Sequence, residues 1–313
     1  MYIGIDLGGT NIAAAIVDGG GRIQKRCNIP TNADGGAQAI AEGLADVCRT
    51  LLKNEGAIAS IGIGVPGAVN SLTGDVIFTP NLPLSGVNIS RDLQGEFGCP
   101  VYLGNDANCA ALGESVSGGA KGAKDVVFIT LGTGVGGGVI IGGHLHSGVN
   151  DAAGELGHMV ISSGGRLCGC GRRGCWERYA SASGIILTAK GFMGAHRDSL
   201  LWELCGGVVK NLDGRMVFDA FRAGDGAAAL TLKRYVEHLA VGVVNLINIF
   251  EPELFCVGGG ISSSWDCFAE PLQAAVDGER FMRFSADSPQ TRIVKATLGN
   301  DAGIIGAAML GVY

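Results

Sequence analysis

The 313-residue chain lacks several features that would assign it to a common functional class. It has no run of basic residues and a formal net charge of −6, which argues against nucleic acid or an acidic membrane as a partner, although a phosphorylated ligand held by backbone groups and a metal stays possible. No apolar run approaches membrane-spanning length, since even the run 239–250 is broken by Gly242, Asn245 and Asn248. The opening residues have neither the basic start nor the apolar core of a signal peptide. We therefore expect a cytoplasmic protein with no membrane partner.

The ten cysteines do not have the spacing of a disulfide scaffold. Seven are scattered and mostly flanked by apolar residues, as buried free thiols usually are. The other three follow a histidine within one glycine-rich stretch, and one imidazole with three thiols matches a tetrahedral structural zinc site. Reduced cysteines in a loop without metal are the alternative. A metal would also hold rigidly the two carboxylates at the edges of the stretch, Glu155 and Glu177. The predicted zinc ligands are His158, Cys168, Cys170 and Cys175.

The length predicts about two domains, and a hydrophobic content of 47% is ample for a core in each. The 54 glycines cluster at the ends of apolar runs instead of forming linkers. The strand-like run 2–7 ends in Gly-Gly-Thr-Asn at 8–11, and a second strand-like run follows at 12–17. This pattern predicts a hairpin turned by glycine.

The same device recurs about 125 residues later, where the apolar run 126–131 leads into the glycine-rich segment 132–138 and then into 139–141. Two copies of one device suggest two similar domains facing each other. Residues 132–137 also match the dinucleotide pattern G-x-G-x-x-G, but that motif needs a helix after the loop, and β-branched residues follow here. A Rossmann site is therefore disfavoured.

No P-loop lysine motif is present, so a bound phosphate would depend on backbone N–H groups, short polar side chains and a metal ion. The two predicted hairpins offer this chemistry, because glycine lets the main chain approach an anion and Thr10, Asn11 and Thr133 add short donors. A side chain at Gly134 would obstruct the approach of a phosphate. Ordinary tight hairpins in a glycine-rich protein are the alternative.

A further polar group follows the strand-like run 101–103, where Asn105 and Asp106 precede the helical segment 109–114. The end of a strand that leads into a helix is where open α/β sheets present catalytic groups, and a carboxylate there can accept a hydroxyl proton. Simple capping of the helix is the alternative. The turn at 64–67 and the proline-bounded loop 79–83 are possible walls of a polar pocket.

Two later segments bear on the fold. The apolar run 254–257 leads into glycines 258–260, which either simply turn the chain or let a flat ring such as adenine lie against the backbone. The segment 301–310 is rich in Ala, Ile and Gly, and it is expected to be a buried helix that returns to the first domain.

Five motifs, in order along the whole chain, resemble those of the ROK family of sugar kinases, and the likeness is greatest to bacterial ROK glucokinases. They are D6-x-G8-G9-T10-N11, N105-D106-A107-N108, L131-G132-T133-G134-V135-G136-G137-G138, G154-E155-L156-G157-H158 and C168-x-C170-G171-x2-G174-C175-x-E177.

The resemblance implies an α/β protein with two ribonuclease-H-like domains of the actin- and hexokinase-like ATPase fold around a central cleft. We expect the first domain to comprise 1–120 with the returning helix 300–313, and the second to comprise 121–299 with the zinc loop. The family also implies a homodimer or higher homo-oligomer.

The resemblance further implies ATP-dependent phosphorylation of a hexose at its 6-hydroxyl, with glucose as substrate and Asp106 as catalytic base. Asp6 would face magnesium. The expected substrate-binding residues are Gly67, Asn81, Asn105, Asp106, Glu155, His158 and Glu177. The expected ATP-binding residues are Asp6, Gly8, Gly9, Thr10, Asn11, Gly132, Thr133, Gly134, Gly136, Gly137, Gly138 and Gly259.

Three other functions are compatible with parts of this pattern. A kinase for N-acetylmannosamine or N-acetylglucosamine would use a similar polar set, and the sequence does not size the pocket around C2 of the sugar. A non-catalytic sugar sensor would share the fold, but it would not need Asp6, Asp106 and both phosphate loops together. A ROK-type repressor would need a DNA-binding domain, and we do not expect one, because the first phosphate motif already begins at Asp6.

Overall fold

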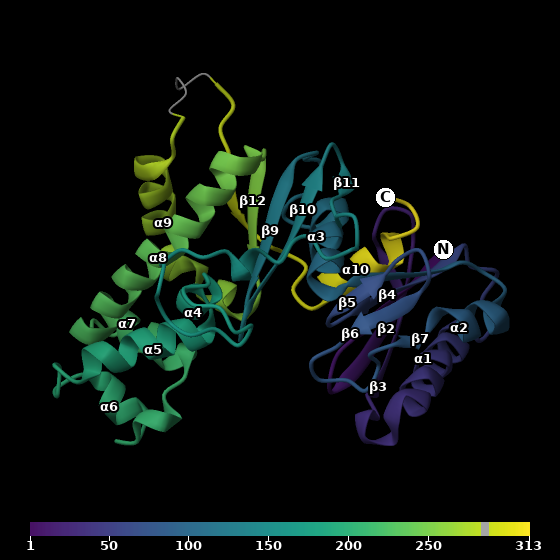
Figure 1. The fold of residues 1–313 in the computed structure, drawn as a ribbon, viewed down its shortest axis with the longest axis horizontal. Helices are drawn as coiled ribbons and strands as arrows, with labels where there is room; N and C mark the ends of the chain where they lie inside the picture. Colours follow the sequence, from purple (N-terminus) through teal and green to yellow (C-terminus); the bar gives the residue numbers. More distant parts are fainter. Residues whose placement is uncertain (283–287) are drawn as a thin grey trace. The chain divides into compact units, whose positions relative to one another are not determined.

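The computed structural model describes residues 1–282 and 288–313. The chain forms two compact units (Figure 1). The first contains residues 1–128, 137–154 and 296–313, and the second contains 129–136 and 155–295. Each unit is a mixed α/β structure, and each is described here by itself.

The first unit is built on a five-stranded mixed sheet in the order β3-β2-β1-β4-β8. β1 pairs antiparallel with β2, as the predicted hairpin requires, and parallel with β4 on its other side. The apolar runs that predicted β1 and β2 are almost fully buried, since both faces of these strands are covered. The strands are β1 (Tyr2–Leu7), β2 (Asn11–Val17), β3 (Ile23–Pro30), β4 (Ser60–Val65) and β8 (Val101–Asn105).

Helix α10 (Asp301–Met309) packs on α3 (Asp106–Ser117) and β1, although almost 200 residues separate it from α3 in the chain (Figure 1). A Cβ at Gly306 would lie 1.6 Å from the carbonyl oxygen of Cys109, so the two helices approach as closely as glycine permits. The predicted buried helix at 301–310 therefore belongs to the first unit. The unit also contains α1 (Gly36–Leu52), α2 (Ser90–Phe97), the 3₁₀ turn η1 (Ala33–Gly35) and a small sheet of β5 (Ala68–Asn70), β6 (Asp75–Phe78) and β7 (Val87–Asn88).

The second sheet has the order β11-β10-β9-β12-β13. Numbered by appearance within each sheet, both sheets read 3-2-1-4-5, which agrees with the expected pair of similar domains. β9 and β10 pass from one unit into the other. The strands are β9 (Val126–Leu131), β10 (Val135–Ile141), β11 (His144–Leu145), β12 (Leu254–Gly258) and β13 (Arg292–Lys295).

The sequence suggested that the whole glycine-rich segment 132–138 is a loop, but only its first part is. β10 begins at Val135, so Gly136, Gly137 and Gly138 are strand residues. The reason at Gly138 is packing, because a Cβ there would lie 2.6 Å from Cβ of Ala111 on α3. Since a strand follows β9 directly, the helix that a dinucleotide fingerprint needs is absent here.

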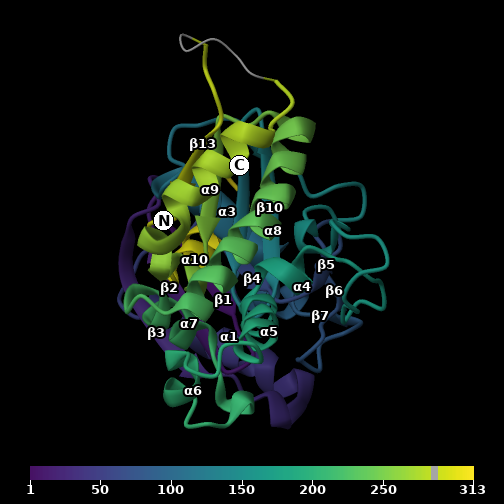
Figure 2. The same ribbon diagram turned by 90° about the vertical axis from the view of Figure 1, so that its left-hand side faces the viewer.

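The helices of the second unit gather around α8 (Gly226–Phe250) (Figure 2). The indole of Trp176 is fully buried against this helix, where a Cβ at Gly242 would come within 2.0 Å of the ring. Trp176 also donates from Nε1 to the carbonyl of His238 at 2.9 Å, so its ring is fixed in orientation. No described helix has the length and apolarity that a bilayer crossing requires. The remaining helices are η2 (Leu156–His158), α4 (Glu177–Ala180), α5 (Ala182–Met193), α6 (Leu200–Leu204), η3 (Val209–Asn211), α7 (Gly214–Arg222), η4 (Gly260–Ser264) and α9 (Trp265–Glu279).

Candidate functional site

The four predicted zinc ligands form one cluster in the second unit, with their donor atoms all within 4.8 Å of one another. Sγ of Cys170 lies 3.6 Å from Sγ of Cys175, and Sγ of Cys168 lies 3.7 Å from Nδ1 of His158. A tetrahedron with Zn–S bonds of about 2.3 Å has edges of about 3.8 Å, so these two donor pairs already have nearly the spacing that zinc needs. Four N and S donors suit a closed structural site. Burial raises the pKa of the Cys175 thiol to about 12, so zinc binding would displace protons.

The loop between the histidine and the last cysteine is a small two-stranded structure. Val160 bridges Cys175, and Leu167 bridges Arg173. Gly174 has a φ of +84°, and a Cβ on it would lie 1.7 Å from the carbonyl oxygen of Ser162, so only glycine fits. The loop therefore presents its ligands from a folded backbone.

Arg166 anchors the same loop, and no motif in the sequence indicated this role. Its guanidinium donates to the carbonyl of Arg178 at 2.9 Å and to Oγ1 of Thr188 at 3.0 Å. It also lies 4.6 Å from the centre of the Tyr179 ring, within cation–π range. These contacts tie the loop to α4 and α5 independently of any metal.

Two predicted sugar-binding residues lie on one short 3₁₀ turn of the second unit. Glu155 is exposed and precedes η2, and His158 ends it, with its backbone N–H donating to the carbonyl of Glu155 at 3.1 Å. Since Nδ1 of His158 faces the thiols, Nε2 remains for another partner.

Glu177 begins α4 and has contacts on two sides. Its Oε2 accepts from the backbone N–H of Val135 at 3.2 Å, and its Oε1 lies 3.6 Å from Sγ of Cys168. The structure thus places this carboxylate between the turn that precedes β10 and the thiol cluster.

Asn105 and Gly67 come together in the first unit. Asn105 donates from Nδ2 to the carbonyl of Gly67 at 3.1 Å, and its Oδ1 accepts from Ala107 and Asn108 at 2.9 and 3.1 Å. Asn105 is therefore the N-cap of α3, as the capping alternative proposed, and any ligand contact would come in addition. Asn81 is exposed on the loop between β6 and β7, which is closed by a bond from Thr79 Oγ1 to the Leu82 carbonyl at 2.6 Å.

Asp106 is the first residue of α3, and its Oδ1 accepts from the N–H of Ala107 at 2.8 Å. Asp6, near the end of β1, belongs to the same unit. Burial, and secondly repulsion from the Asp106 carboxylate, raise the pKa of Asp6 from 3.8 to about 6. Two interacting carboxylates, one of them half-buried, are a donor set that suits Mg²⁺, whose charge would offset this repulsion.

We expect the Asp6→Asn substitution to stabilise the ligand-free protein at high pH. Because the folded state raises the pKa of Asp6, its contribution to stability is full below about pH 4 and is lost as the pH rises through 6. A shift of this size corresponds to a gain for the variant of as much as about 3 kcal/mol above pH 7. Thermal denaturation without Mg²⁺ at pH 4 to 8 measures it.

Asp266→Asn is the control with the opposite sign, because hydrogen bonds from Arg222 lower the pKa of Asp266. That variant should lose stability at neutral pH. An Asp6→Asn protein that is less stable than the parent at pH 8 would contradict the conclusion that the charged Asp6 carboxylate destabilises the folded protein.

Each predicted phosphate-binding hairpin has an exposed threonine near its tip. In the first unit the N–H of Gly8 donates to the carbonyl of Asn11 at 2.9 Å, and Gly9 and Thr10 are exposed. In the second, the N–H of Gly132 donates to the carbonyl of Gly134 at 3.0 Å, and Thr133 is exposed. Both turns thus present short polar residues to solvent.

Gly259 follows β12 with a φ of +82°, and a Cβ there would lie 2.5 Å from the backbone nitrogen of Leu131. Turning the chain against β9 therefore already accounts for this glycine. A contact with adenosine remains a prediction.

No role was predicted for Asn108 from the sequence. It is 3% exposed, and within the described chain its Oδ1 is buried without a hydrogen-bond partner. It lines a cavity of about 310 Å³ in the first unit together with Asn105, Ser71 and Asp151. Its only sequence signal was its place in the N105-D106-A107-N108 motif.

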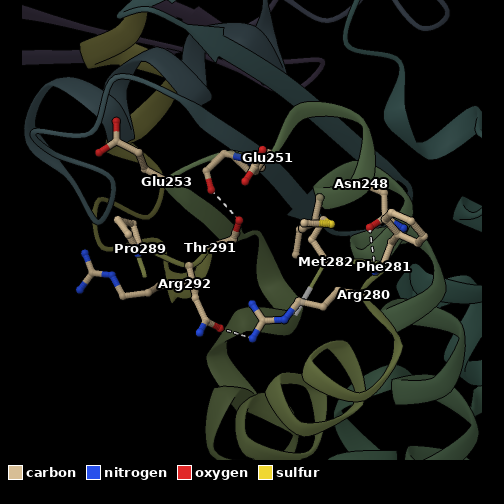
Figure 3. A pocket seen from close by; sticks show the side chains of 12 residues that line it. Asn248, Glu251, Glu253, Arg280, Phe281, Met282, Pro289, Thr291 and Arg292 are labelled. Atoms are coloured by element: carbon tan, nitrogen blue, oxygen red, sulfur yellow. Dashed lines mark hydrogen bonds between the residues drawn. The ribbon is translucent and has the colours of Figure 1, made fainter. Parts of the chain in front are cut away.

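A larger cavity of about 810 Å³ lies in the second unit, at the amino ends of β12 and β13 (Figure 3). Arg280 and Gln290 bond to each other on one wall, and Thr291 donates to the Pro252 carbonyl at 2.6 Å on another. None of the predicted site residues lines it. Ligands of open α/β sheets bind at the carboxyl ends of strands, so this cavity is at the opposite edge from the Gly258–Gly260 turn.

Comparison with known proteins adds to this geometry. The ROK family model matches residues 2–312. The chain is 38% identical to a glucokinase of Halalkalibacterium halodurans over 99% of its own length and 94% of that protein. It is 32% identical to an N-acetyl-D-glucosamine kinase of Yersinia enterocolitica over 99% of both chains. A ROK family glucokinase from Streptomyces griseus, solved in complex with glucose and AMPPNP, is 34% identical with a TM-score of 0.80 over 99% of this chain and 98% of that one. The chain belongs to the ROK family, and its two five-stranded sheets are those of the actin-like ATPase fold.

Proposed function

We propose that this protein is an ATP-dependent hexokinase that phosphorylates glucose at its 6-hydroxyl. The observation that carries the proposal is the full-length similarity to the Streptomyces griseus glucokinase, whose crystal structure contains glucose and an ATP analogue. The present chain supplies groups suited to this chemistry, namely a carboxylate at the start of α3, a second carboxylate in β1 and two hairpins with exposed threonine tips.

In this proposal Asp106 accepts the proton of the 6-hydroxyl as its oxygen attacks the γ-phosphate. The hairpin backbones and Thr10 and Thr133 hold the phosphates, and positioning supplies most of the catalysis, as is usual for phosphoryl transfer. Asp6 would hold Mg²⁺, which when bound offsets charge on the phosphate oxygens.

The sugar hydroxyls would be bound by Asn81, Asn105, Glu155, His158 and Glu177. A site built to bond particular hydroxyls leaves buried acceptors unpaired when the wrong sugar enters, which gives selectivity. The three cysteines would fix the orientation of His158 through the shared zinc ion. The metal would not act on the phosphate, because three thiolates and one imidazole complete its tetrahedral shell.

The test is ADP release with a panel of hexoses and 2-acetamido sugars. A glucokinase releases ADP fastest with glucose. A preference for N-acetylglucosamine or N-acetylmannosamine would favour the second candidate, which the Yersinia relative supports. Sugar binding without any ADP release would favour a non-catalytic sensor and contradict both kinases.

We expect Gly132→Ala to weaken MgATP binding by roughly tenfold or more while glucose binding stays unchanged. A Cβ at Gly132 meets no atom within 4 Å, so the folded protein accommodates it, but it would occupy space through which a phosphate approaches the turn. Gly134 is a poorer probe than the sequence suggested, because a Cβ there would lie 2.4 Å from Oε2 of Glu177.

Calorimetric titration with MgATP and separately with glucose measures this effect. Gly191→Ala, on α5 and also in open space, is the matched control and should leave both affinities unchanged. Equal weakening of both ligands by Gly132→Ala would argue against a phosphate-binding turn.

A further inference from the structure

The turn Gly132–Val135 of the second unit, called here the phosphate turn, is held at three points by the segment Glu177–Ser183. Glu177 Oε2 accepts from the N–H of Val135 at 3.2 Å, the N–H of Ala182 donates to the carbonyl of Gly132 at 2.8 Å, and Oγ of Ser183 donates to the carbonyl of Thr133 at 3.2 Å. Only the Glu177 contact comes from a charged side chain.

The Glu177 carboxylate occupies the space that a side chain at Gly134 would take. A Cβ at Gly134 would lie 2.4 Å from Oε2 and 3.3 Å from the carboxyl carbon. With glycine at 134, the carboxylate can therefore lie against the turn, and a Cβ there would displace it. A carboxylate that accepts from a backbone N–H forms a charge-assisted hydrogen bond, which is stronger than a neutral one.

The position of Glu177 is fixed by its neighbour in the chain. Trp176 is fully buried against Gly242, bonds through Nε1 to the His238 carbonyl, and donates its backbone N–H to the carbonyl of Met159 at 2.8 Å. These contacts are made by protein groups alone. The packing of α4 on α8 thus places the Glu177 carboxylate next to the phosphate turn.

We propose that Glu177 is a positioning residue for the phosphate turn, in addition to any contact it makes with a sugar. By fixing the N–H of Val135 it holds the turn in the conformation that receives ATP, so that little reorganisation accompanies binding. The proposal rests on the proposed function, because it needs the turn to bind ATP. It distinguishes Glu177 from Glu155, the other carboxylate of the predicted sugar set.

The test compares Glu177→Ala, Glu177→Gln and Glu155→Ala by calorimetric titration with MgATP in the absence of sugar. Glu177→Ala should weaken MgATP binding roughly tenfold, as expected for loss of a hydrogen bond to a charged group. Glu177→Gln keeps an oxygen that accepts from Val135 and should recover most of this affinity. Glu155→Ala should raise the glucose KM and leave the MgATP affinity unchanged.

Hydrogen exchange of the Val135 amide supplies a readout that needs no ligand. It should be faster in Glu177→Ala than in the parent or in Glu155→Ala. If the parent binds MgATP and Glu177→Ala binds it equally well, the positioning role is overturned. If the parent does not bind MgATP, the proposed function fails, and unchanged exchange at Val135 in Glu177→Ala would overturn the positioning role separately.

Discussion

Asp106→Ala is expected to lower the turnover of glucose phosphorylation by about 10²- to 10⁴-fold, the usual contribution of a general base. The helix itself should survive, since Asn105 keeps its two cap bonds to Ala107 and Asn108. Removal of a carboxylate from the first turn costs only about 0.3–1 kcal/mol through the helix dipole. The variant should therefore fold and bind MgATP, with the loss confined to the chemical step.

Steady-state kinetics with glucose, combined with calorimetric titration of MgATP, separates these effects. Asp92→Ala is a matched control, because Asp92 is also in the first turn of a helix of the first unit, α2. It should leave turnover unchanged. A folded Asp106→Ala protein with near-normal turnover would contradict the assignment of the base.

The first unit also shows how Asp106 and Asp6 depend on each other. Repulsion from Asp106 contributes to the raised pKa of Asp6, so removal of Asp106 should lower the pKa of Asp6. The two residues are 100 positions apart in the chain, and only the parallel pairing of β1 with β4 and of β4 with β8 brings their strands into one sheet. This electrostatic link could not be predicted from either motif alone.

Strands with continuous apolar runs were predicted well from the sequence. β1 and β9 begin and end where their largely apolar runs do, because strands covered on both faces need mostly apolar side chains. The start of β10 was not predicted, because its Gly136–Gly138 segment carries no side-chain pattern. Gly138 is required by the close approach of α3, which is a tertiary contact.

The zinc cluster was predictable because its ligands stand within 18 residues of one another and their chemistry is specific. The contact between Glu177 and Val135 was not predictable, since Val135 lies 42 residues away and contributes only a backbone N–H. The anchoring role of Arg166 could not be predicted either, because it depends on the positions of Tyr179 and Thr188 after folding. Local chemistry was visible in the sequence, and contacts to backbone groups of distant segments were not.

Cys170→Ser is expected to abolish zinc binding and to raise the glucose KM by about 10- to 100-fold, the usual effect of disturbing the groups that orient a site residue. Zinc binding to such ligands is worth roughly 10 kcal/mol or more in small domains, so loss of one thiolate should empty the site. Cys170 is exposed, with its Sγ 3.6 Å from that of Cys175, so the substitution leaves the core intact. In the proposed site, the His158 ring would then lose the partner that fixes its orientation toward the sugar.

The affinity for MgATP should stay close to that of the parent, because Trp176 and Arg166 hold the segment that carries Glu177 without help from the metal. Metal analysis should find about one zinc per chain in the parent, none in Cys170→Ser, and the parent value in Cys27→Ser, a half-buried thiol of β3. A zinc-free variant with an unchanged glucose KM would contradict the proposed coupling between the metal loop and sugar binding. A zinc-free variant that lost MgATP affinity as fully as Glu177→Ala would show that the phosphate turn follows the metal and not the carboxylate.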